Sequence, residues 1–232
     1  MKLAIMQPYF LPYLGYFQLI VAANLFVVYD TINSTKKGWI NRNRLLRDGR
    51  DAMFSLPLQG GPDQSHVCER HLAETFDRNK LINHFVTAYR RAPHFCETIE
   101  LLESVVRYKN DNLFEFVHHA IGAVCGHLSI TTPIRTASQM TIDHGLKSEQ
   151  RVLALCEALG ASTYINAIGG VHLSSANAFC EKGIDLKFIE SGPFEYRQLG
   201  QPFVASLSIA DAMMFNPIEA IREALDGGYE LI

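Results

Sequence analysis

Residues 2–30 read KLAIMQPYFLPYLGYFQLIVAANLFVVYD, and this stretch decides the fold class. Lys2–Gln7 is short and apolar and is followed by a proline, which is typical of a buried strand. Tyr13–Ala23 carries apolar residues at helical spacing, and Leu25–Tyr29 is a second apolar strand. Because the connections are short, we expect two parallel strands joined by a crossover helix.

The rest of the chain continues this alternation of strands and helices. Further strands are expected at Met53–Leu58, Ile134–Ala137, Thr163–Asn166 and Leu186–Glu190. Further helices are expected at Ser148–Leu159, Ser174–Lys182, Ile209–Phe215 and Pro217–Leu225, and a helical pattern fills 77–128 with breaks near Pro93 and Asn110. The pattern predicts an α/β, Rossmann-like, doubly wound and mainly parallel sheet. We expect one domain over residues 1–232, with a helical insertion or cap at about 70–130.

Composition narrows the class of protein. The chain has 232 residues, 48% of them hydrophobic, so it can bury a large core without disulfides or metals. A net charge of −3 argues against a protein that mainly coats nucleic acid. The N-terminus resembles no signal peptide and no apolar run reaches the roughly 18 residues that span a bilayer, so we expect a cytoplasmic protein without a membrane partner.

The cysteines and histidines suggest no metal or redox chemistry. Five cysteines lie at irregular spacing without a Cys-x-x-Cys pair, which indicates reduced thiols that act as small buried residues. His118, His119 and His172 lack metal-ligand spacing. We therefore expect neither a metal nor a cofactor.

The loop after the first strand is the first candidate site. Ligands of open parallel sheets bind beyond the carboxyl ends of the strands, and residues 7–16, QPYFLPYLGY, occupy that place. Two prolines stiffen the loop, and a glycine in the first helical turn permits a close approach to the backbone. The ligand-binding candidates here are Gln7, Tyr9, Tyr13 and Gly15. The alternative is that the tyrosines form only a packing stripe.

The same loop resembles the His-x-Gly-His loop of the nucleotidylyltransferase superfamily. Residues 13–16, YLGY, stand where that superfamily has its motif, with Tyr13 and Tyr16 in place of the two histidines. The resemblance implies the fold and a phosphate or nucleotide pocket. It does not imply nucleotidyl transfer, because the histidines that stabilise the phosphoryl transition state are absent.

A basic stretch after the second strand is the second candidate site. Within residues 36–50 the only acid is Asp48, and the cations are Lys36, Lys37, Arg42, Arg44, Arg47 and Arg50. If the chain is extended there, Arg42 and Arg44 share one face and Asn41 and Asn43 the other. Guanidinium groups suit phosphate, and Trp39 offers a face for stacking. The alternative is a solvated charged surface.

Three further segments carry polar candidates. Asp30 ends the second strand, and Asn166 ends a later one before Gly169 and Gly170, whose backbone N–H groups can face a ligand. Ser208 and Asp211 have the spacing of a helix capping box, so for them a structural role is at least as well supported as a functional one.

Four blocks together resemble the WbqC-like family, which is known from surface-glycan gene clusters. They are residues 6–17, 38–44, 164–170 and 207–211, and they span nearly the whole chain. The chain departs from the family pattern at residues 30–33, DTIN, where the family has an Asp-Asp pair and a glutamine, and at Ala167, where it has a proline. The resemblance implies attachment of an amino acid such as glycine to an amino sugar.

Three functional hypotheses remain open. In the first, a group-transfer enzyme holds the phosphates of an activated substrate with Arg42, Arg44 and Lys36 or Lys37, while Asp30 or Asp211 orients or deprotonates an amine. In the second, the acceptor is a phosphorylated base in phage DNA. In the third, the protein is a non-catalytic nucleotide- or sugar-binding module. The sequence does not indicate an oligomeric state.

Overall fold

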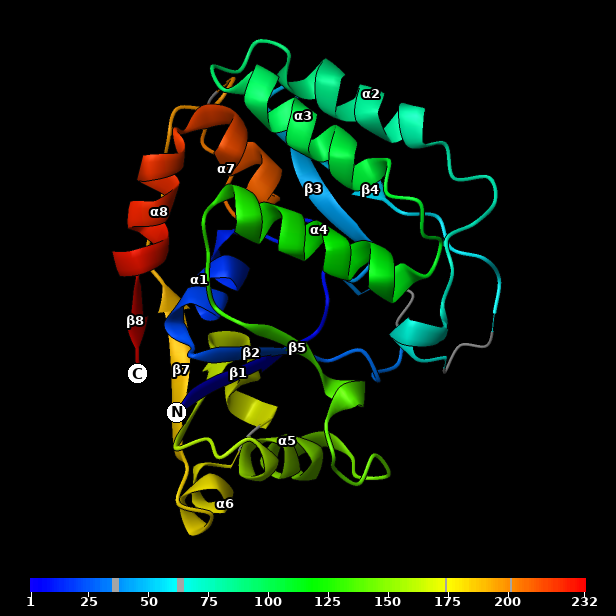
Figure 1. Ribbon diagram of the computed structural model, residues 1–232. Helices are drawn as coiled ribbons and strands as arrows, with labels where there is room; N and C mark the ends of the chain where they lie inside the picture. The colour runs from blue at the N-terminus through cyan, green and yellow to red at the C-terminus, as the bar shows by residue number, and fades with distance from the viewer. Residues whose placement is uncertain (35–37, 62–64, 174, 201) are drawn as a thin grey trace.

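The computed structural model describes residues 1–34, 38–61, 65–173, 175–200 and 202–232. A six-stranded sheet in the order β5-β2-β1-β6-β7-β8 forms its centre (Figure 1). The strands are β1 (Lys2–Met6), β2 (Leu25–Val28), β5 (Ile134–Thr136), β6 (Thr163–Ala167), β7 (Asp185–Ser191) and β8 (Tyr229–Leu231). All neighbouring strands pair in parallel except β8, which runs antiparallel to β7.

The strand order confirms the Rossmann-like fold class. Counted along the chain, the five parallel strands lie in the order 3-2-1-4-5, so the connections diverge between β1 and β6. That divergence is the switch point at which open α/β sheets bind ligands. It places the loop after β1 and the loop after β6 side by side at the carboxyl edge.

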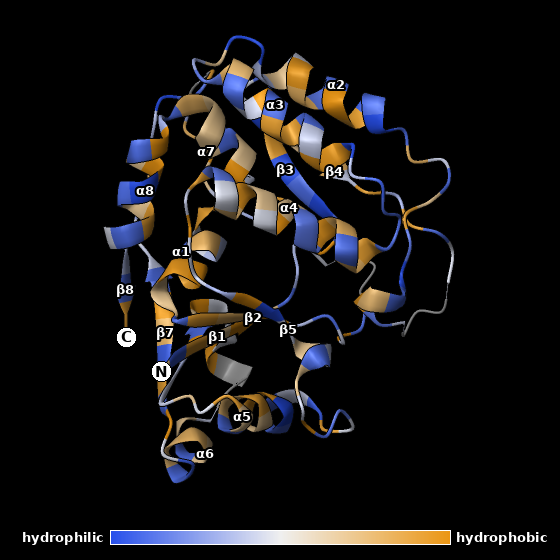
Figure 2. Cartoon of the chain, viewed as in Figure 1, coloured by the Kyte–Doolittle hydropathy of each residue, from blue (hydrophilic) through white to orange (hydrophobic). Residues whose placement is uncertain are grey.

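Both faces of the sheet are covered, because side chains alternate along the buried strands. Leu3 and Ile5 belong to one buried cluster, which also includes residues of α5 (Ser148–Ala158) and α6 (Ala176–Glu181). Ala4 faces the larger cluster on the other side, which includes α1 (Leu14–Ala22), α7 (Ile209–Phe215) and α8 (Ile218–Gly227). Figure 2 shows apolar residues along β1 and β2 between these two helical layers.

The middle of the chain adds a hairpin and a helical layer over the larger cluster (Figure 1). The hairpin consists of β3 (Arg42–Arg47) and β4 (Arg50–Ser55). It is followed by η1 (Val67–Glu69), α2 (Arg78–Tyr89), α3 (Phe95–Val106) and α4 (Leu113–His127). The helix breaks near Pro93 and Asn110 are thus confirmed.

One strand expectation needs correction, and one strand of the sheet was not expected. The strand predicted at Met53–Leu58 is instead β4, which ends at Ser55 and pairs only within the hairpin. β8 was not predicted, because its three residues carry no periodic pattern.

The helix α4 begins at an N-cap residue, Asn112, whose side chain accepts the Glu115 N–H at 3.1 Å. None of the helices in the described parts of the chain combines the length and hydropathy that crossing a membrane requires.

The cysteines are all free but differ in burial. Cys125 and Cys156 are buried, and burial raises the pKa of both thiols to about 12. Cys96 and Cys180 are exposed, which corrects the expectation that all five are small buried residues, and Cys68 is intermediate.

The thiols should therefore react with a disulfide reagent in a fixed order. At pH 8 a thiol with a pKa near 12 is only about 0.01% thiolate, so Cys125 and Cys156 should react only after unfolding. Cys96 and Cys180 should react first, and mass spectrometry of labelled peptides measures the order. Fast native labelling of Cys125 would contradict the described core.

Candidate functional site

The loop after β1 is held by the hairpin that carries the basic stretch. The Phe10 N–H donates to the Ile40 carbonyl at 2.9 Å. The Asn43 amide donates to the carbonyls of Phe10 at 3.2 Å and Leu11 at 2.7 Å. From the chain before α7, the Ser208 hydroxyl donates to the same Leu11 carbonyl at 2.8 Å. Segments some 30 and 200 residues away in the sequence thus meet at one turn.

Leu11 shows why the loop needs this support. Its φ is +45°, although it is not glycine, and its side chain is fully buried. A non-glycine residue in this region costs roughly 1–2 kcal/mol, and such conformations persist where the surroundings enforce them. The two hydrogen bonds to the Leu11 carbonyl fix the course of the loop relative to the hairpin.

Asn43 is therefore a structural residue, which corrects its assignment as a ligand contact. It is 6% exposed, and its amide oxygen accepts the Arg44 N–H at 2.8 Å. Asn41 is likewise engaged, because its amide donates to the Leu56 carbonyl at 2.8 Å. The predicted alternation is confirmed for Arg42, Asn43 and Arg44, since Asn43 is buried between two less buried arginines. Asn41 lies in the turn before β3, so its predicted face is not tested.

Removal of the Asn43 amide should destabilise the fold. We expect Asn43→Ala to lower the free energy of unfolding by about 2–4 kcal/mol, because two carbonyls lose a donor and the Leu11 backbone loses a restraint. Urea unfolding measures the change. Asn41→Ala is the matched control, with an expected cost near 1 kcal/mol for one half-buried bond. Equal costs for both variants would contradict the bracing role of Asn43.

Trp39 and two arginines form the cationic part of the candidate site. The Arg42 and Arg44 guanidinium carbons lie 5.6 and 5.8 Å from the centre of the Trp39 ring. Trp39 is 42% exposed, so its ring can also take part in stacking with a ligand. The Arg42 Nε donates to the Gly38 carbonyl at 2.8 Å, which orients its guanidinium beside the indole.

Arg44 is held by protein groups on both sides of the hairpin. It lies 3.3 Å from an Asp51 carboxylate oxygen across the hairpin and donates to the Ser206 carbonyl at 3.1 Å. It thereby ties the hairpin to the segment before α7. Lys36 and Lys37 lie outside the described residues.

Gly15 lies in the first turn of α1, as predicted, but the protein itself uses the space above it. A Cβ at Gly15 would collide with the Tyr13 ring and lie 2.7 Å from the Ser191 hydroxyl oxygen. The glycine therefore permits Tyr13 and Ser191 to pack against the helix start, rather than a ligand. Tyr13 remains 40% exposed.

The other residues of the first loop divide between packing and exposure. Gln7 is exposed, and its carbonyl accepts the Tyr16 hydroxyl at 2.9 Å. The rings of Tyr9 and Tyr16 have centroids 5.7 Å apart, and burial raises the pKa of both hydroxyls. The packing alternative therefore holds for Tyr9 and Tyr16, while Gln7 and Tyr13 stay accessible.

The loop after β6 likewise contains both packed and exposed residues. The Asn166 amide oxygen accepts the Ala167 N–H at 2.9 Å, and its amide fills the space where Gly170 would carry a Cβ. Gly169 is exposed, with open space where a Cβ would lie. The Gly169 backbone is therefore accessible to a ligand, as are the exposed side chains of Ile168 and Val171 on either side.

Both acids proposed as catalytic groups are buried. Asp30 is 2% exposed, and its carboxylate accepts the Ser138 N–H at 3.0 Å, which ties the loop after β2 to the loop after β5. Asp211 has no exposed surface. It accepts hydrogen bonds from Tyr89 at 2.9 Å, Tyr196 at 2.7 Å and Gln198 at 2.8 Å.

The contacts of the two acids are structural ones. Both oxygens of Asp211 accept hydrogen bonds from protein groups, and Oδ1 of Asp30 accepts the Ser138 N–H. The catalytic roles of Asp30 and Asp211 stay predictions. Burial raises the pKa of Asp211, although its three hydrogen bonds act in the opposite direction. Ser208 is the N-cap of α7, since its hydroxyl accepts the Ala210 N–H at 3.3 Å. The predicted capping box with Asp211 does not form, because the Ser208 N–H donates to the Arg44 carbonyl instead.

His118, for which the sequence predicted no role, lies close enough to Asp30 for the two charges to interact. His118 of α4 is half-buried and stacks on Phe114, with ring centroids 5.4 Å apart. Burial lowers its pKa, and the charges of Glu115 and Asp30 oppose that shift in part. Its imidazole is therefore neutral near pH 7 and able to accept a proton. The adjacent His118 and His119 carry no sequence signal that would reveal this.

Two cavities lie outside the Trp39–Arg42 region. One, of about 480 Å³, lies where β7 ends and β8 begins, and Ser191 lines it. The other, of about 250 Å³, lies between α1 and α8. In the parts of the chain that the structure describes, no three His, Cys, Asp or Glu side chains are grouped so that they could hold a metal ion.

The fold is that of a Rossmann-like α/β protein, and the loop between its first strand and first helix is held by a hairpin that carries basic residues. The chain belongs to the WbqC-like protein family, whose model matches residues 7–223. This confirms the resemblance found in the sequence. The chain is similar to the "Uncharacterized protein Rv1507c" of Mycobacterium tuberculosis (strain ATCC 25618 / H37Rv), with 26% identity over 218 residues and 93% of each chain covered. No solved structure was found to match it.

Proposed function

We propose that this protein is a group-transfer enzyme that acts on a phosphate- or nucleotide-activated substrate. One observation carries the proposal. Arg42 and the exposed Trp39 lie 5.6 Å apart on a hairpin that is hydrogen-bonded to the loop after β1. A guanidinium group suits phosphate, and an indole face suits a base or sugar ring. Because the hairpin is hydrogen-bonded to the loop after β1, Arg42 and Trp39 lie beside the carboxyl edge of the sheet, where such folds bind ligands.

In the proposed reaction an amine attacks the carbon that bears a phosphate or nucleoside phosphate. The C–N bond forms, the C–O bond to the leaving group breaks, and the electron pair leaves with the phosphate. Arg42 stabilises the charge that develops on that leaving group. The amine loses one proton, and we assign its acceptance to His118, which is half-buried on α4 and close enough to Asp30, at the end of β2, for their charges to interact.

The proposed amine and acceptor follow from the family resemblance. The product would be an amino acid such as glycine joined to an amino sugar of a surface glycan. The alternative acceptor is a phosphorylated base in DNA, which the exposed arginines Arg47 and Arg50 at the tip of the hairpin favour. The net charge of −3 disfavours it.

The test incubates the purified protein with labelled glycine and one activated acceptor at a time. Nucleotide-activated amino sugars and a DNA duplex with a phosphorylated base are the two acceptor sets. We expect labelled product and released phosphate, or nucleoside phosphate, in equal amounts with the sugar set. A gel shift that weakens steeply with salt, together with product on DNA, would transfer the proposal to the DNA acceptor. Tight nucleotide binding in calorimetry without product from either set would leave a binding module.

A further inference from the structure

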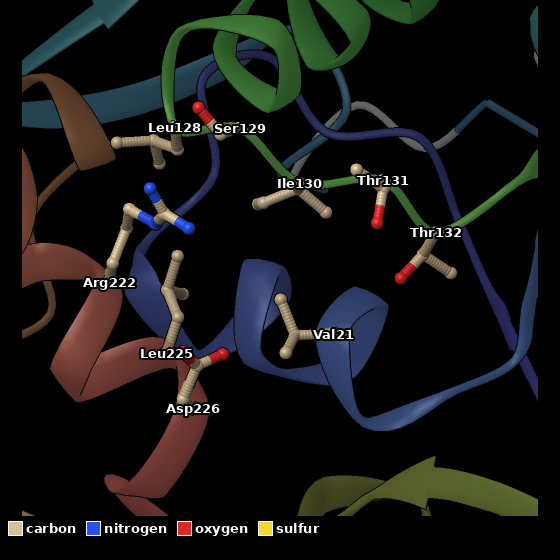
Figure 3. Close-up of a pocket in the computed structure, with 9 residues that line it drawn as sticks. All are labelled: Val21, Leu128, Ser129, Ile130, Thr131, Thr132, Arg222, Leu225 and Asp226. Carbon is tan, nitrogen blue, oxygen red and sulfur yellow. The ribbon is translucent and has the colours of Figure 1, made fainter.

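The smaller cavity lies apart from the proposed transfer site. It has a volume of about 250 Å³ and is lined by the last turn of α1, by α8 and by the connection from α4 to β5 (Figure 3). None of its lining residues comes from the loops that follow the parallel strands. Its volume is below the roughly 300–1,000 Å³ of sites for drug-sized ligands, so it suits a smaller metabolite.

Two opposite charges on α8 line this cavity without pairing to each other. Arg222 and Asp226 are one helical turn apart, and both extend from α8 toward the cavity in Figure 3. Oppositely charged residues at this spacing can form an ion pair. Glu103 of α3 and Arg107, its C-cap, form such a pair at the same spacing but in the opposite order, with 3.8 Å between them. Arg222 and Asp226 are described side chains, yet no ion pair within 4.0 Å joins them.

The remaining walls of the cavity complement a small amphiphilic molecule. Val21 and Leu225 supply apolar surface, and Thr131 and Thr132 supply hydroxyl groups on the side away from α8 (Figure 3). We infer that the cavity binds a free α-amino acid with a small apolar side chain. Arg222 binds its carboxylate, Asp226 binds its ammonium group, and Val21 and Leu225 contact its side chain.

This site would be distinct from any amino-acid substrate site at the carboxyl edge. The ligand bridges α1 and α8, and the first turn of α1 carries Gly15, against which Tyr13 packs. Bound amino acid therefore stabilises the position of α1 and raises the melting temperature by mass action. The inference does not depend on the proposed transfer reaction.

Calorimetry and thermal melts with L-alanine and L-valine test the inference. Propionate and propylamine are the probes that carry one charge each. We expect both amino acids to bind and to raise the melting temperature, and each single-charge probe to bind at least tenfold more weakly. Arg222→Gln and Asp226→Asn should each weaken amino-acid binding tenfold or more. Arg107→Gln, the matched change in the pair on α3, should leave binding unchanged.

Two results would overturn the inference. One is the absence of binding at amino-acid concentrations up to about 10 mM, or equal binding of the single-charge probes. The other is binding that survives both α8 variants but disappears in Arg42→Ala, which would place the amino acid at the transfer site. The second result would leave the proposed function intact. Conversely, if Arg42→Ala loses turnover but still binds the amino acid, the inference about the cavity holds and the two proposals are separated.

Discussion

Replacement of Arg42 by alanine should reduce turnover by about 10²–10³-fold while the protein stays folded. The Arg42 guanidinium lies against the exposed Trp39 ring, as that of Arg44 does, and is oriented by the Gly38 carbonyl. Removal of one preorganised donor to a developing charge typically costs about 2.7–4 kcal/mol of transition-state stabilisation. The measurement is the rate of labelled-glycine incorporation at saturating acceptor.

Three controls separate catalysis from folding. Arg42→Lys keeps the charge but loses the planar fork, so it should recover only part of the rate. With the sugar acceptors, Arg47→Ala removes the same charge from an exposed position on the same strand and should change the rate less than twofold. Circular dichroism of Arg42→Ala should match the parent protein. Unchanged kinetics in folded Arg42→Ala would remove the assigned role and with it the proposed function.

Replacement of Asp211 by alanine should cost about 3–5 kcal/mol of unfolding free energy. The variant leaves the hydroxyls of Tyr89 and Tyr196 and the amide of Gln198 without their acceptor in the core. The Tyr89 hydroxyl also accepts the Leu46 N–H at 2.9 Å, so the loss reaches the hairpin. Urea unfolding measures the cost, and a value below 1 kcal/mol would contradict this account.

The pH dependence of stability should show the raised pKa of Asp211. Because burial raises this pKa in the folded state, the native protein binds the proton more tightly than the unfolded chain does. The stability that the neutral carboxyl supplies is complete below its unfolded pKa of 3.8 and is lost as pH rises through the folded pKa. Relative to Asp211→Asn, which does not titrate, the parent protein should lose unfolding free energy over that range. A difference that grows with pH would show the opposite shift.

Local patterns in the sequence were sufficient for the fold class. The apolar strand of residues 2–6, the loop with two prolines and the helix that follows define a crossover unit, and the helix breaks lie where predicted. Such features depend on neighbouring residues, which set backbone preference and periodicity. The same locality explains the failure at β4, because a short strand pattern does not indicate which strand it pairs with.

The roles of the polar residues depended on distant contacts. Asn43, Asp30 and Asp211 have the residue types of a binding site, yet the structure engages each with protein groups far away in the sequence. Gly15 has the spacing of a ligand-approach glycine, but the Tyr13 ring fills the space. His118 gave no motif, and only the packing of α4 brings it within range of Asp30.

The sequence by itself determined the Rossmann-like alternation, the edge at which a ligand would bind and the family to which the chain belongs. Only the tertiary structure decided which polar side chains at that edge face solvent, as Trp39 does, and which are buried, as Asn43 is. The physical reason is that periodicity is a local property of the chain. Burial and hydrogen-bond partnership arise only when segments as far apart as Leu11 and Ser208 come into contact.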